Sequence, residues 1–102
     1  MSDELRRLLQ NEVHRVDWRP LAPHAKRGGL VLVDAELDLV EVAVAVATDQ
    51  SAAVQQWMEA LQLRRPSEDQ IRSWQNETEE RFRVVIVQPY VLAQRDTGPA
   101  AS

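Results

Sequence analysis

The chain contains 102 residues, the length of one typical domain, of which 44% are hydrophobic and 27% are charged. Its formal net charge of −4 argues against a protein that binds nucleic acid or anionic membranes mainly through phosphate groups. Cysteine is absent, which excludes disulfides, thiol catalysis and cysteine-ligated metal centres. We therefore expect a single domain over residues 1–94 and a flexible C-terminal tail over residues 95–102.

The N-terminal residues do not resemble an export signal. Asp3 and Glu4 stand where a secretory signal needs basic residues, and the positions after them are polar where it needs apolar ones. No uncharged stretch reaches the roughly 18–20 apolar residues that span a bilayer. We therefore expect a cytoplasmic protein that does not enter a membrane.

The first predicted element is an amphipathic helix over residues 3–16. Leucine and valine recur there at helical spacing, and Ser2 is a suitable N-cap before two acidic residues. Two prolines interrupt the next segment, so residues 18–24 should be irregular or form a single turn. The glycine pair at positions 28–29 then predicts a turn.

A β-hairpin is predicted after this turn. Its first strand covers residues 30–33, and the turn-like sequence Asp34-Ala35-Glu36 leads to a longer strand over residues 37–47. Valine and alanine alternate along the second strand, which makes both of its faces apolar. Such a strand requires a cover on each face.

Two helices and a last strand complete the predicted fold. Asp49 or Ser51 can cap the second helix, which should end near Leu63, and Ser67 opens the third helix with a Ser-x-x-Gln capping box. Residues 82–94 then form one strand, in which Pro89 requires a bulge or an edge position.

The predicted order is therefore helix, strand, strand, helix, helix, strand, or α-β-β-α-α-β. This order indicates an α+β fold of one domain. Its helices would pack with a small mixed or antiparallel three-stranded sheet.

Four carboxylates lie close together between residues 34 and 41. A calcium-binding EF-hand loop beginning at Asp34 would need glycine and glutamate where this chain has leucine and alanine. We therefore interpret most of these acids as solvated charges. Asp38 and Glu41 flank the most hydrophobic stretch, and their burial there would require a basic partner.

The sequence carries no catalytic or cofactor-binding signature. His14 and His24 have no metal-site spacing, and no serine occurs in a Gly-x-Ser-x-Gly elbow. The glycine pair precedes a predicted strand, whereas phosphate-binding loops follow one, so we interpret the basic residues before it as balancing the acidic segment. The sequence predicts no metal and no cofactor, and it favours a protein that is not an enzyme.

The aromatic residues divide into two groups. Trp57 and Trp74 occupy apolar helical positions and are expected to pack in the core. Trp18 lies in the irregular segment and Tyr90 follows a proline, so either is suited to line a pocket or an interface.

Several segments resemble a family of small bacterial proteins known as domain of unknown function 2288. The resemblance rests on the order of Leu-Asp-Leu-Val-Glu-Val-Ala from residue 37, Trp57, Trp74 and Val-Val-Ile-Val-Gln-Pro-Tyr-Val-Leu-Ala-Gln from residue 84. It extends from the first helix to residue 94, with Tyr90 where we expect tryptophan in the family. The resemblance implies a cytoplasmic bacterial protein and assigns no functional residue.

Two functions are consistent with these features. The first is a non-enzymatic interaction module that forms a homodimer, or binds a protein partner, through the apolar face of its sheet. The second is a small-ligand or metal-binding protein. Its candidate residues are Trp18, Asp38, Glu41, Gln88, Tyr90 and Gln94. We expect no binding to nucleic acid or membranes.

Overall fold

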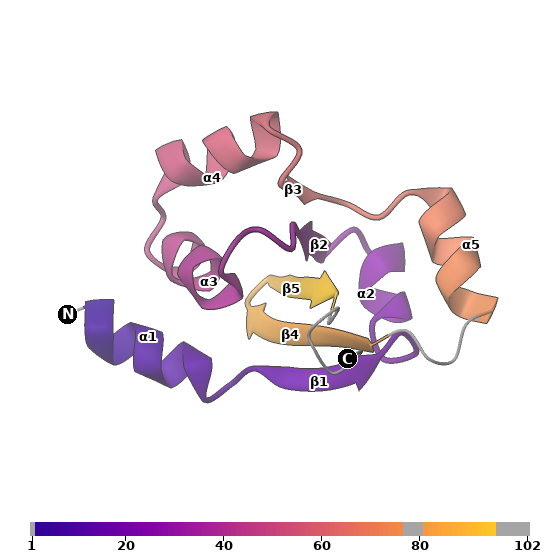
Figure 1. The fold of residues 1–102 in the computed structure, drawn as a ribbon, viewed down its shortest axis with the longest axis horizontal. Coiled ribbons are helices and arrows are strands. Elements are labelled where there is room, and N and C mark those ends of the chain that lie inside the picture. The colour runs from indigo at the N-terminus through magenta and orange to yellow at the C-terminus, as the bar shows by residue number, and fades with distance from the viewer. Residues whose placement is uncertain (1, 77–80, 96–102) are drawn as a thin grey trace.

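The computed structural model describes residues 2–76 and 81–95, and Figure 1 shows how their elements are arranged. In chain order the elements are α1 (Ser2–Gln10), β1 (His14–Asp17), α2 (Ala22–Lys26), β2 (Leu30–Val33), α3 (Leu39–Ala47), α4 (Ser51–Glu59), β3 (Leu63–Arg64), α5 (Glu68–Asn76), β4 (Arg81–Val87) and β5 (Tyr90–Arg95). The chain is a small α+β domain, as its sequence predicts.

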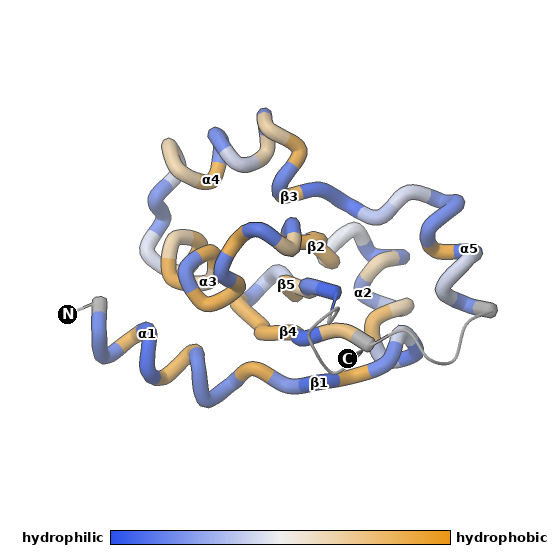
Figure 2. Tube along the Cα trace, viewed as in Figure 1, coloured by the Kyte–Doolittle hydropathy of each residue, from blue (hydrophilic) through white to orange (hydrophobic). Residues whose placement is uncertain are grey.

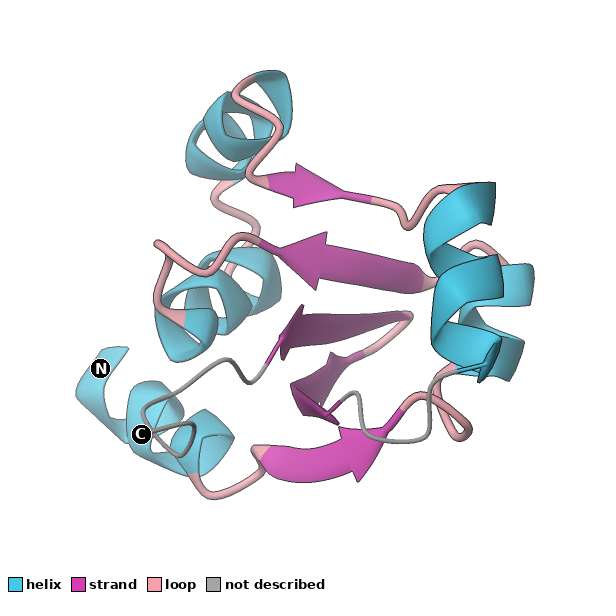
Figure 3. Cartoon of the chain, turned by 45° about the vertical axis from the view of Figure 1, so that its right-hand side comes forward, coloured by secondary structure: helices cyan, strands magenta, loops and turns pink. Residues whose placement is uncertain are grey.

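The strands form one mixed sheet in the order β1-β4-β5-β2-β3. β2 and β5 are parallel, with Leu30 opposite Val91, while the other neighbouring strands are antiparallel. Figure 3 shows helices on both sides of this sheet, with α1, α3 and α4 on one side and α2 and α5 on the other. The domain therefore has three layers.

The prediction of a strand over residues 37–47 is wrong, because most of this segment forms the helix α3. The Asp38 carboxylate caps it by accepting hydrogen bonds from the backbone N–H groups of Val40 and Glu41, at 2.9 and 3.3 Å. Six of the nine helical residues are buried, and Figure 2 shows apolar residues around most of the helix. A helix that is covered on most sides needs no polar face, so its sequence resembles a buried strand.

The expected three-stranded sheet is also wrong in number, since the described residues form five strands. The segment 82–94 is a hairpin of β4 and β5, in which Val87 pairs with Tyr90 across the turn Gln88-Pro89. Proline stands at the turn, where its missing N–H breaks no ladder hydrogen bond.

The remaining strands arise where the sequence predicts that helices continue. The first predicted helix corresponds to α1, which ends at Gln10 and is followed by β1. The second predicted helix corresponds to α4, which ends at Glu59 before the short β3. Leu61 adopts a left-handed backbone conformation between α4 and β3, which stops the helix before residue 63. The element order α-β-β-α-α-β is therefore replaced by the ten elements given above.

Several local predictions are confirmed. Residues 30–33 form β2, and Gly28 has a φ of 79° in the turn before it, where glycine is favoured. The capping box at the start of α5 is present: the Gln70 N–H donates to the Ser67 hydroxyl at 3.1 Å, and the Ser67 N–H donates to the Gln70 amide oxygen at 3.0 Å.

Each face of the sheet has its own hydrophobic cluster. On the face toward α3, the strands contribute Val33, Val85 and Leu92. On the face toward α2 and α5, they contribute Leu30, Phe82 and other residues, because successive side chains of a strand point to opposite faces. Both faces of the central strands are thus covered by helices of the same chain.

The tail predicted over residues 95–102 lies almost entirely outside the described residues. Its first residue, Arg95, is the last residue of β5. Within residues 2–76 and 81–95, no helix has the length and apolar character required to cross a bilayer.

Candidate functional site

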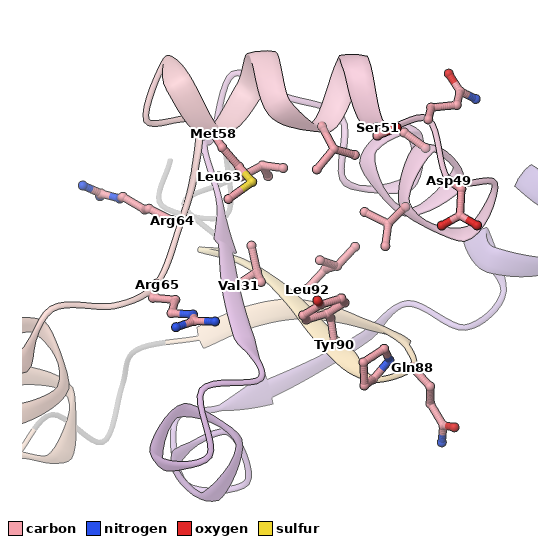
Figure 4. Close-up of a pocket in the computed structure, with 15 residues that line it drawn as sticks. Val31, Asp49, Ser51, Met58, Leu63, Arg64, Arg65, Gln88, Tyr90 and Leu92 are labelled. Carbon is pink, nitrogen blue, oxygen red and sulfur yellow. The ribbon is translucent and has the colours of Figure 1, made fainter.

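A cavity of about 380 Å³ lies beneath α4, on the α3 side of the sheet. In Figure 4, Val31 of β2 and Leu92 of β5 form its floor, and Met58 of α4 faces them across an open space. Val54 of α4 also lines the cavity. We call this cavity the α4 groove.

The α4 groove exists because α4 does not close on the sheet. Val54 and Trp57 are only partly buried, Met58 is 56% exposed, and no residue of α4 is fully buried. A surface helix normally buries its apolar stripe against the core. Here part of that stripe lines the groove instead.

The hairpin between β4 and β5 contributes the aromatic part of the groove. Tyr90 lies on the same face of β5 as Leu92 and is 41% exposed, and Figure 4 shows its ring at the floor. The adjacent turn packs against Gly29, where a methyl group in place of the glycine hydrogen would lie 3.4 Å from the Pro89 carbonyl oxygen. The Val91 N–H also donates to the Gly29 carbonyl at 2.9 Å, which fixes the hairpin against β2.

Opposite charges occupy the two ends of the α4 groove. In Figure 4, Arg65 lies at one end, beside Val31, and Asp49 lies at the other, beside Ser51. Arg64 also lines the groove, but its side chain is directed away from it in the figure. The groove is therefore apolar in the middle and polar at both ends.

The predicted site residues fall in different places. Gln88 and Tyr90 both line the α4 groove, although Figure 4 shows the Gln88 side chain pointing away from it. Asp38 lines a second, more open cavity of about 480 Å³ with Arg15 and Arg83. The structure thus does not assemble the six candidates around one cavity, and their role in binding remains a prediction.

Structural roles account for two further candidates. The side-chain amide of Gln94 is buried and donates to the backbone carbonyls of Asp34 and Leu37, at 2.9 and 2.6 Å. Glu41 is exposed on α3 and forms an ion pair with Arg6 of α1. Gln94 therefore fixes the loop before α3, and the Glu41 pair links two helices.

Trp18 is buried in the cluster on the opposite face of the sheet. Its ring centroid lies 5.1 Å from that of Trp74 and 6.0 Å from that of Phe82. The indole N–H has no hydrogen-bond acceptor among the described residues. Trp18 is therefore a core residue here and does not line the α4 groove.

Sequence reasoning misses most of the groove. Arg65 has an ordinary explanation as a favourable charge at a helix C-terminus, and Val31 as a strand residue, so neither carries a local signal for binding. Tyr90 has such a signal, because it follows a proline, and Gln88 is a sequence-based candidate that also lines the groove. Among the described residues, no group of three or more histidine, aspartate or glutamate side chains could hold a metal ion.

Comparison with known proteins gives a consistent family assignment. The chain is similar to PA1075 from Pseudomonas aeruginosa, whose solution structure was determined by NMR: the two are 34% identical, with a TM-score of 0.77 over 88% of this chain and 82% of that one. No curated protein matches the chain. The model of the family described as protein of unknown function (DUF2288) matches residues 4–95, and this chain therefore belongs to that family.

Proposed function

We propose that this chain is a non-enzymatic binding protein whose small-molecule ligand occupies the α4 groove. The observation that carries the proposal is an apolar cavity left open under a helix whose own apolar residues are not fully buried. Its volume of about 380 Å³ falls within the roughly 300–1,000 Å³ that is typical of small-molecule sites. A ligand there would cover Val54, Met58 and Leu92 and so remove apolar surface from water.

A neutral, apolar fluorescent dye such as Nile red tests this proposal. Substituting Val54→Trp should fill the groove, because this half-buried residue projects into it from α4. We expect the substitution to weaken dye binding by about tenfold or more, the effect of losing one well-buried apolar contact. Fluorescence titration measures the dissociation constant.

The matched control is Ala52→Trp on the same helix. Ala52 is exposed and does not line the groove, so its replacement adds a similar apolar side chain elsewhere. The control should bind the dye as the unmodified protein does. Equal loss in both variants, or no saturable dye binding by the unmodified protein, would overturn the proposal.

A second copy of the chain is the alternative occupant of this region. The segment predicted to drive self-association through its two apolar faces is the helix α3, which is buried. Met58 of α4 and Leu61, which follows this helix, are 56% and 69% exposed. Contact between these residues in two copies of the chain would bury them. Sedimentation equilibrium at micromolar concentration decides this alternative: a single species of 11.6 kDa excludes a dimer.

A further inference from the structure

We infer that the ligand of the α4 groove is an amphipathic anion, with an aromatic or aliphatic body and one carboxylate that is bound at the Arg65 end. This inference rests on the proposed function, since it names the chemical class of the ligand in the same groove. The charge of the ligand is inferred from the positions of the charged side chains around the groove, because the apolar lining does not indicate it.

The fold brings two basic segments to one end of the groove. A methyl placed on Gly28 would lie 3.9 Å from the Arg65 Cζ, so the guanidinium of Arg65 lies against the turn that follows α2. Lys26 and Arg27 immediately precede this turn, and both are exposed. The segments are far apart in sequence, and of these three cations Arg65 lines the groove.

These cations are not neutralised within the part of the chain that the structure describes. Among those residues, no carboxylate forms an ion pair with Lys26, Arg27 or Arg65. The side chain of Arg65 also takes part in no hydrogen bond within the described residues. Its planar guanidinium can therefore bind a carboxylate through two parallel hydrogen bonds.

The other end of the groove fixes the orientation of the ligand. Asp49 lies there and would repel an acidic group, so a single anion is favoured only at the Arg65 end. Between the ends, Val31, Leu92 and the ring of Tyr90 offer an apolar floor. An aromatic body can stack on Tyr90 while its carboxylate reaches Arg65.

Three probes that share a naphthalene ring and differ in its substituent test the inference. They are naphthalene-2-carboxylate, its neutral amide, and 2-naphthylmethylammonium. We expect the carboxylate to bind about tenfold more tightly than the amide, the effect of one charge-assisted hydrogen-bonded pair that is partly exposed. The ammonium should bind more weakly than the amide. Isothermal titration calorimetry gives the three dissociation constants.

The variant Arg65→Gln should weaken binding of the carboxylate about tenfold and so abolish its preference over the amide. Arg64→Gln is the matched control, because it removes the same charge from a side chain that points away from the groove. It should keep most of the preference. Thermal unfolding checks that both variants are folded.

The outcomes separate this inference from the proposed function. If the amide binds as tightly as the carboxylate, or if the ammonium binds best, the ligand class is wrong but the groove still binds small molecules. If Arg64→Gln and Arg65→Gln reduce the preference equally, binding reflects general surface charge, and the assignment to Arg65 is overturned. If none of the probes binds, both the inference and the proposed function fail.

Discussion

On the face of the sheet covered by α2 and α5, the rings of Trp18, Trp74 and Phe82 pack together with centroids 5.1 to 6.0 Å apart. On the other face, α3 closes the core in the same way, but the next helix, α4, leaves a cavity above Val31 and Leu92. Both faces are built on the same strands. The comparison indicates that one face serves stability, whereas the other combines stability with an accessible apolar surface.

Truncating a side chain on the closed face should have the largest effect on stability. Phe82 is fully buried, and Phe82→Ala should lower the free energy of unfolding by about 3–5 kcal/mol because it leaves a cavity among the aromatic rings. Val54→Ala on the open face should cost less than about 1 kcal/mol, since Val54 is half-buried beside an existing cavity. Denaturation by urea measures both.

Equal losses in these two variants would contradict the distinction between the faces. A loss in Val54→Ala that approaches that of Phe82→Ala would mean that α4 is packed as tightly as the core. A small loss in Phe82→Ala would mean that the aromatic cluster contributes little to folding.

A smaller effect is expected at the loop that leads into α3. Gln94→Leu removes the amide that donates to the carbonyls of Asp34 and Leu37, and the two carbonyls lose their buried donor. The expected cost is about 1–3 kcal/mol. Unfolding by urea measures this cost. The substitution should also increase the rate of amide hydrogen exchange more at the start of α3 than in β4.

The same variant separates a structural from a binding role for Gln94. Because Gln94 does not line the α4 groove, Gln94→Leu should bind Nile red as the unmodified protein does. A specific loss of dye binding at unchanged stability would instead place Gln94 in the site, in agreement with the sequence-based hypothesis.

The parts of the fold that depend only on residues close together in the sequence are predictable from it. The capping box at Ser67 and Gln70 and the turn at Gly28 are local, and both form as expected. The segment after Asp38 is misassigned as a strand because alternating valine and alanine satisfies a buried strand and a buried helix equally well. The burial of α3 by the surrounding elements, together with the N-cap at Asp38, favours the helix.

The groove is mostly beyond prediction for a related reason. Val31, Val54, Arg65 and Leu92 come from separate parts of the chain, and no spacing in the sequence links them. Tyr90 is recognisable because it follows the proline of a turn. The charge of Arg65 has an ordinary local explanation, and its place in the groove depends on the path of the chain after α4.

NMR tests most directly whether the open face, and not the closed face, binds small molecules. Naphthalene-2-carboxylate is titrated into ¹⁵N-labelled protein, and the changes in backbone amide chemical shift are mapped. We predict that the largest changes fall on Val31, Val54 and Leu92, while Trp18 and Trp74 remain almost unchanged. Changes centred on Trp18 and Trp74, or no saturable changes at all, would contradict the assignment of binding to the open face.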